Sequence, residues 1–220
     1  MAKSGARSQG GASRASEPTR ARMIEAAIQT LKERGFAGAS ARAIAETGTF
    51  SQALVFYHFG SVNGLLLAAL DATSDLRMRR YTAALEGVNS LPELMRVAAA
   101  VYREDLVSGH IKVLAELIAG ASTSPELGPE IVKRVQPWIR FTEDAVGKVV
   151  AGTPLDPLVP RSSLAFAIVS LYLGAELLTH LQADPSRADE LFDTGIRLTG
   201  LIGMLLAPGP QASGPEGHES

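Results

Sequence analysis

The apolar residues of this chain recur mostly at helical spacing. Ile24, Ala27, Ile28 and Leu31 follow the i, i+3, i+4, i+7 pattern of one buried helix face. Comparable stretches follow along the chain, separated by Gly, Pro and Ser, and we see no strand-like alternation and no internal repeat. The pattern predicts an all-α fold of about nine helices, with an N-terminal three-helix helix-turn-helix domain followed by a C-terminal helical bundle.

Capping and breaking residues set the expected helix bounds. Pro18 is placed to open the first helix and Gly35 to end it. Ser40, Ser51 and Ser61 are good N-caps for the next three helices. The remaining pattern predicts five more helices, over residues 90–107, 110–121, 124–150, 161–182 and 187–206.

Composition shifts predict the organisation of the chain. Residues 1–17 are basic and rich in small residues, without an apolar core, so we expect a disordered arm, no signal peptide and a cytoplasmic location. Residues 18–60 form the three-helix domain, and residues 61–207 form the second domain, in which the helix over 61–86 is the connector. Residues 208–220 are too rich in Pro, Gly and polar residues to fold.

The stretch LAFAIVSLYLGAELL, residues 164–178, is apolar almost all round. A membrane span is one interpretation, but Glu176, His180 and Gln182 leave too short an uncharged run, so we expect no membrane partner. A soluble helix of this kind is covered on two sides. We expect a homodimer built from the last two helices; an ordinary monomer core is the alternative. The expected interface residues are Leu164, Ile168, Leu171, Leu178, Ile196, Leu198, Ile202 and Leu205.

Charge is distributed unevenly along the chain. The net charge is −2, yet residues 1–60 hold eight Lys/Arg against four Glu, which leaves this part at +4 and the remainder at −6. A basic N-terminal part on an acidic body favours a polyanion partner for the first part, although chance and a basic tail would give the same balance.

Several functional classes lack their usual residues. The chain has no cysteine, its four histidines are dispersed, and neither a glycine-rich phosphate loop nor a Gly-x-Ser-x-Gly elbow occurs. We therefore expect no metal site, no cofactor and no enzymatic activity.

Two short helices joined by a tight turn, over residues 40–47 and 51–59, fit a helix-turn-helix. Val55 and Phe59 belong to the inner face of the second helix. Its outer face holds side chains suited to DNA, since Gln pairs with adenine, Ala contacts a thymine methyl, and Tyr and His reach phosphates.

Residues 19–70 resemble the DNA-binding domain of the TetR (tetracycline-repressor) family of transcriptional regulators. The resemblance rests on ERGFAGAS, RAIAE and YHF, the last followed at once by the cap of a long helix. It implies a homodimeric one-component regulator, most often a repressor, that binds a palindromic double-stranded DNA operator and is released by a small, apolar effector held in the C-terminal domain. By position, Ser40 and Arg42 would contact phosphate, His58 would approach the backbone, and the major groove would meet Ser51, Gln52, Ala53 and Tyr57.

The sequence departs from the family pattern around the turn. The family spacing puts Thr49 where a glycine is usual, so either Thr49 adopts a strained positive φ or Gly48 makes the turn. Phe56 and Val62 replace a tyrosine and a lysine that would contact phosphate. Four arginines near the N-terminus, Arg7, Arg14, Arg20 and Arg22, could compensate for these phosphate contacts.

The resemblance also implies an effector pocket. Its candidate residues are Tyr102, His110, Glu116, Trp138, Phe141, Tyr172 and Glu176. A helical adaptor or interaction protein without effector-controlled DNA binding is the alternative function.

Overall fold

The structure, a computed structural model, describes residues 9–108, 110–153, 156–157, 160–182 and 184–206. Over these ranges the chain folds into nine helices without a strand, which confirms the predicted all-α fold. The helices are α1 (Gln9–Gly38), α2 (Ala41–Gly48), α3 (Ala53–Phe59), α4 (Val62–Ala84), α5 (Leu91–Ser108), α6 (His110–Gly120), α7 (Leu127–Val150), α8 (Arg161–Gln182) and α9 (Ser186–Leu206).

Helix α1 begins earlier than the sequence pattern predicts. Residues 9–17, expected in a disordered arm, are helical, and Pro18 lies inside the helix. Ala and Arg are strong helix formers, and extending an existing helix requires propagation rather than a new nucleus. Residues 1–8 and the predicted tail over residues 208–220 lie outside the described residues. Gly35 ends the regular part of α1 as predicted, because its φ of 66° is left-handed.

The serine caps hold the next helices in register. Ser40 Oγ accepts from the Ala43 backbone N–H at 3.2 Å, and Ser61 Oγ accepts from that of Gly64 at 2.9 Å. Ser51 Oγ accepts from the backbone N–H of Ala53, the first residue of α3, at 3.2 Å. The caps predicted at Ser40 and Ser61 are therefore present, and α3 begins two residues after Ser51.

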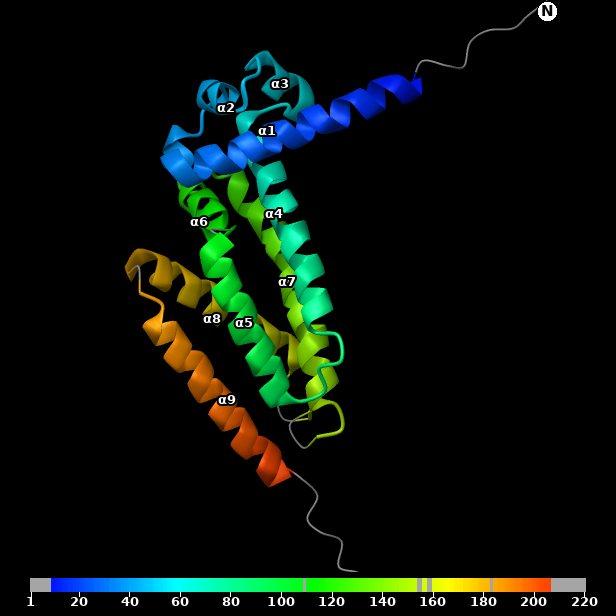
Figure 1. Cartoon of the computed structure of the whole chain (residues 1–220), viewed down its shortest axis with the longest axis vertical. Coiled ribbons are helices and arrows are strands. Elements are labelled where there is room, and N and C mark those ends of the chain that lie inside the picture. Colours follow the sequence, from blue (N-terminus) through cyan, green and yellow to red (C-terminus); the bar gives the residue numbers. More distant parts are fainter. Residues whose placement is uncertain (1–8, 109, 154–155, 158–159, 183, 207–220) are drawn as a thin grey trace, which may run out of the picture.

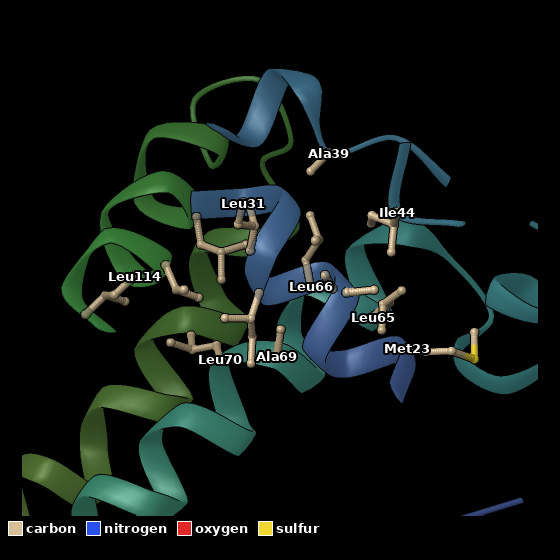
Figure 2. Close-up of a cluster of buried hydrophobic side chains, with 14 of the residues drawn as sticks. Met23, Leu31, Ala39, Ile44, Leu65, Leu66, Ala69, Leu70 and Leu114 are labelled. Atoms are coloured by element: carbon tan, nitrogen blue, oxygen red, sulfur yellow. The ribbon is translucent and has the colours of Figure 1, made fainter. Parts of the chain in front are cut away.

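One apolar core runs from the helix-turn-helix into the second domain. Met23 and Leu31 of α1, Ile44 of α2 and Leu66 of α4 are buried together in it (Figure 2). The same cluster takes in Leu114 of α6, and α7 contributes Leu127 and Ile131. One buried apolar cluster therefore joins the two parts of the chain through α1, α4 and α6.

The helices of the second domain extend away from α1, while α2 and α3 lie on its opposite side (Figure 1). Within this domain α5 packs against α9, and α7 packs against α8. By length and composition α8 would also suit a membrane span, and only 17% of its most apolar 18-residue window is buried within the chain. One side of α8 is therefore open and apolar.

Candidate functional site

Helix α3 turns a polar and aromatic face to solvent. Ser51, Gln52 and Ala53 at its start are exposed, and Tyr57 one turn later is 81% exposed. On its inner side Val55 is fully buried. A tyrosine this exposed is available for contact with a partner. This is the face of the helix that the sequence predicts would enter the major groove of DNA.

Ser40 and Arg42 lie beside this face at the start of α2 and are exposed. Arg42 Nε is 2.9 Å from Glu46 Oε1, with both side chains more than half exposed. Arg42, Thr49 and Gln52 help to line one shallow hollow between α2 and α3. An exposed ion pair of this kind contributes little to stability, so the guanidinium is free to exchange Glu46 for a phosphate.

Thr49, not Gly48, makes the turn between α2 and α3. Thr49 has φ 52° and ψ 54°, in the left-handed region, and the Phe50 backbone N–H donates to the Ala45 carbonyl at 3.1 Å, which closes the helix end. Gly48 remains in α2, where a Cβ would stand 2.2 Å from a ring carbon of Phe50 and 2.8 Å from Ala26 Cβ. Glycine is needed at 48 for space, while the positive φ falls on a β-branched residue.

Substitutions at these two positions are expected to change the free energy of unfolding in opposite directions. Thr49→Gly relieves the left-handed strain and should raise the free energy of unfolding by about 1 kcal/mol. Gly48→Ala, the matched variant one residue earlier, should lower it by about 1–3 kcal/mol through the clash with Phe50. Urea denaturation at one protein concentration measures both, and a Thr49→Gly variant no more stable than the parent would show that the turn is unstrained.

Arg20 holds the end of α3. Its guanidinium donates to the His58 carbonyl at 2.6 Å and lies over the Phe59 ring, 4.3 Å from the centroid. Arg20 is one of the arginines expected from the sequence to compensate for missing phosphate contacts on DNA. The structure instead gives it a role in fixing α3 against α1. His58 itself is half-buried, with its ring against that of Tyr57 at a centroid distance of 4.9 Å.

The second domain holds a partly open cavity of about 390 Å³, lined by residues of α4 to α9. Trp138, Phe141 and Tyr172, three of the residues predicted for an effector pocket, line this cavity. Its other walls are mostly Leu, Val, Ala and Met side chains. A concave, mainly apolar space with few polar groups is the usual form of a small-molecule site.

Other candidates for the pocket lie elsewhere. Tyr102 is fully buried, with its hydroxyl 2.8 Å from that of Thr179, and does not line the cavity. Glu116 accepts from the Phe36 backbone N–H at 2.8 Å, so it joins α6 to the end of α1. The side chain of His110 lies outside the described residues. Tyr102 and Glu116 therefore have structural roles. The Tyr102 ring packs in an apolar cluster, and the Glu116 carboxylate accepts a hydrogen bond from the Phe36 backbone N–H.

A buried polar cluster forms one wall of the cavity. Arg77 of α4 donates to both carboxylate oxygens of Asp105 of α5, with Nε at 3.0 Å from Oδ1. The hydroxyls of Tyr81 and Tyr172 also donate to Asp105 Oδ2, the latter at 2.8 Å. Burial raises the pKa of Tyr172, so its hydroxyl remains a donor at neutral pH.

The pairing of Arg77 with Asp105 is absent from the residues predicted from the sequence. Arg77 falls seven residues after the buried Leu70, on the same face of α4, and this position is the signal that could have separated it from the exposed Arg79 and Arg80. Asp105 shares the buried face of α5 with Tyr102 and Val101. Nothing in the local sequence pairs the two residues.

Glu176 of α8 lies behind this wall and is fully buried. Its Oε1 is 3.7 Å from Arg77 Nη2, and neither carboxylate oxygen has a hydrogen-bond partner among the described residues. Burial raises the pKa of Glu176 to about 8, although Arg77 opposes that shift.

The open side of α8 and α9 holds many of the residues expected at a dimer interface. Ile168, Leu171, Leu178 and Leu198 are exposed, and Ile196 and Ile202 are half-buried. Leu164 instead packs against a cluster of valines from the end of α7, because α8 begins against that helix. The side chain of Leu205 lies outside the described residues. Further exposed apolar side chains, absent from the expected set, are Phe166, Leu177, Leu181, Leu191 and Leu201.

Known proteins share both the sequence of the N-terminal part and the fold. Residues 23–69 match the family model described as bacterial regulatory proteins, tetR family. The HTH-type transcriptional regulatory protein RaaS of Mycobacterium tuberculosis is 32% identical over 171 residues, which cover 77% of this chain and 74% of that protein.

Solved structures extend the likeness in fold to most of the chain. A TetR-family regulator from Rhodococcus sp. matches with a TM-score of 0.67 at 20% identity, over 87% of this chain and all of that one. The multidrug binding protein EbrR, solved with imidazole, matches with a TM-score of 0.60 at 23% identity, over 82% of this chain and 94% of that one. With the exposed α3 face and this agreement in sequence and fold, the chain belongs to the TetR family of bacterial transcriptional regulators.

Proposed function

We propose that this protein is a homodimeric repressor that binds a palindromic operator through α3 and is released by a small, apolar effector in the helical domain. The observation that carries the proposal is the exposed face of α3 on the basic N-terminal part of the chain. Ser51, Gln52, Ala53 and Tyr57 would read base edges in the major groove, with Ser40, Arg42 and His58 on the backbone.

The proposed dimer uses the open side of α8 and α9. Leu171, Leu178 and Leu181 are each more than half exposed on α8, and Leu198 and Leu201 are so on α9. Burial of apolar surface gives about 25 cal/mol per Å², so a second copy that covers this side would gain substantially. Such pairing would set two α3 helices about 34–36 Å apart, one helical turn of DNA.

The route from cavity to DNA runs through two helices. α4 carries Arg77 and Tyr81 on the cavity wall and begins at the end of the helix-turn-helix. The Phe36 backbone N–H of α1 donates to Glu116 of α6. Lys32 Nζ of α1 donates to the carbonyl of Ser108, the last residue of α5, at 3.0 Å. A ligand that favours one arrangement of α4 and α6 would bias the separation of the two α3 helices by its differential affinity for the two states.

A fold relative supports the effector part of the proposal. EbrR is described as a multidrug binding protein and was solved with imidazole. The cavity of about 390 Å³ gives this chain space for a small molecule.

Selection of bound DNA from a random pool tests the proposal directly. The expected result is an enriched palindrome whose half-sites are one helical turn apart. Loss of all enrichment in repeated selections would contradict operator binding and favour the alternative, a helical adaptor without a DNA role.

Removal of the proposed base-reading groups should weaken that operator specifically. Gln52→Ala with Tyr57→Phe is expected to lower affinity for the selected palindrome by roughly 5- to 150-fold, the usual value of one good base contact. Gln136→Ala, an exposed glutamine on α7, is the matched control and should change nothing. Fluorescence anisotropy at fixed salt measures both, and equal affinities would exclude this face of α3 as the reader.

A further inference from the structure

The Glu176 carboxylate is only weakly paired within the described part of the chain. It is fully buried on α8, neither oxygen has a hydrogen-bond partner among the described residues, and its nearest cation, Arg77 Nη2, is 3.7 Å from Oε1. A buried carboxylate without hydrogen bonds is costly, so its retention in an otherwise apolar domain requires a reason.

Arg77 is already committed to another carboxylate. Asp105 receives two hydrogen bonds from its guanidinium and one from each hydroxyl of Tyr81 and Tyr172. Arg77 and Asp105 therefore balance each other in charge. Burial raises the pKa of Glu176 to about 8, so it is mostly protonated at neutral pH, and its ionisation would give the buried wall one uncompensated negative charge.

The cavity lies beside the polar wall that contacts Glu176. Arg77, Tyr81 and Tyr172 line it, and Glu176 follows the lining residues Leu173 and Ala175 on α8. Three aromatic rings line the cavity together. The ring centroids of Trp138 and Phe141 are 6.3 Å apart, and those of Tyr81 and Trp138 are 5.3 Å apart. Aromatic faces and tyrosine oxygens attract cations, and a charge in apolar surroundings acts over several ångströms.

We propose that the cavity takes an apolar amine, protonated at neutral pH, whose ammonium group lies against the Tyr81 and Tyr172 hydroxyls and stabilises the ionised form of Glu176. This inference rests on the proposed function, because it assumes that the cavity is the effector site. A carboxylate ligand would meet Arg77, but Asp105 already balances that charge, so the ligand would add an uncompensated negative charge to a buried wall. A neutral ligand would leave Glu176 as it is.

Three probes that differ only in the head group test the ligand class. Decylammonium, decanoate and decanol are titrated below their aggregation limits into the full-length protein at neutral pH. The readout is fluorescence of Trp138, the single tryptophan of the chain, which lines the cavity. Decylammonium is expected to bind at least tenfold more tightly than decanoate and decanol.

Glu176→Gln separates charge from shape, because the side chain keeps its size. This variant should bind decylammonium at least tenfold more weakly than the parent and decanol as tightly. Tightest binding of decanoate, equal binding of the three probes, or no binding of any to the wild type would each overturn the amine inference. The wild-type comparison decides the question even where the variant fails to fold.

The operator experiment is separate from this one. An enriched palindrome together with a preference for decanoate would leave the proposed regulator intact and reject only the amine. Amine binding without any enriched DNA would reject the operator role while the cavity assignment stands.

Discussion

Asp105→Ala should lower the free energy of unfolding by roughly 3–5 kcal/mol, the usual cost of removing one partner from a buried ion pair. The substitution leaves Arg77, 8% exposed, without its carboxylate. It also removes the acceptor of the hydroxyls of Tyr81 and Tyr172. Glu176, 3.7 Å away, offers only part of a replacement.

An exposed ion pair gives the matched control. Arg103 Nε and Asp189 Oδ1 are 2.7 Å apart and also join α5 to another helix, but the two side chains are 51% and 39% exposed. Asp189→Ala should therefore cost less than about 1 kcal/mol. Urea denaturation at one protein concentration measures both variants, because dimerisation makes stability depend on concentration.

The double variant identifies the cause. Adding Arg77→Leu to Asp105→Ala removes the orphaned guanidinium and should recover part of the lost stability, since an apolar replacement of a buried ion pair is often tolerated. A loss equal to that of Asp189→Ala, or a double variant whose losses simply add, would show that the charge of Arg77 is not the source of the effect.

Much of the fold follows from short-range patterns. The predicted helix ends agree closely with the structure because Ser40, Ser61 and Gly35 act through hydrogen bonds and backbone angles within a few residues. The start of α1 was wrong because Pro18 is tolerated inside a helix that its neighbours already propagate.

The surface formed by a single helix was predictable from the sequence. The exposed face of α3 follows from the period of that helix, with Val55 inside and Tyr57 outside. Glu116 and the pair of Arg77 with Asp105 depend on contacts between residues 28 or more positions apart. Such contacts are set by how the helices cross, which no local pattern specifies.

Charge on the open side of α8 is expected to break the dimer and with it operator binding. Leu171 and Leu178 are one heptad apart and each 58% exposed, so Leu171→Glu with Leu178→Glu should leave the monomer folded. Each carboxylate would have to be desolvated on pairing, which opposes association. Since two linked half-sites gain about 10²- to 10⁴-fold over one, operator affinity should fall within that range.

Two exposed valines elsewhere give the matched control. Val107 on α5 and Val132 on α7 are 90% and 57% exposed, and Val107→Glu with Val132→Glu adds the same charge outside α8 and α9. This control should remain dimeric and bind the selected palindrome as the parent does. Analytical ultracentrifugation measures the mass of each variant, and fluorescence anisotropy measures its affinity for the operator. A leucine variant that still sediments as a dimer would place the interface elsewhere, and a monomer with full affinity would show that one copy suffices for the operator.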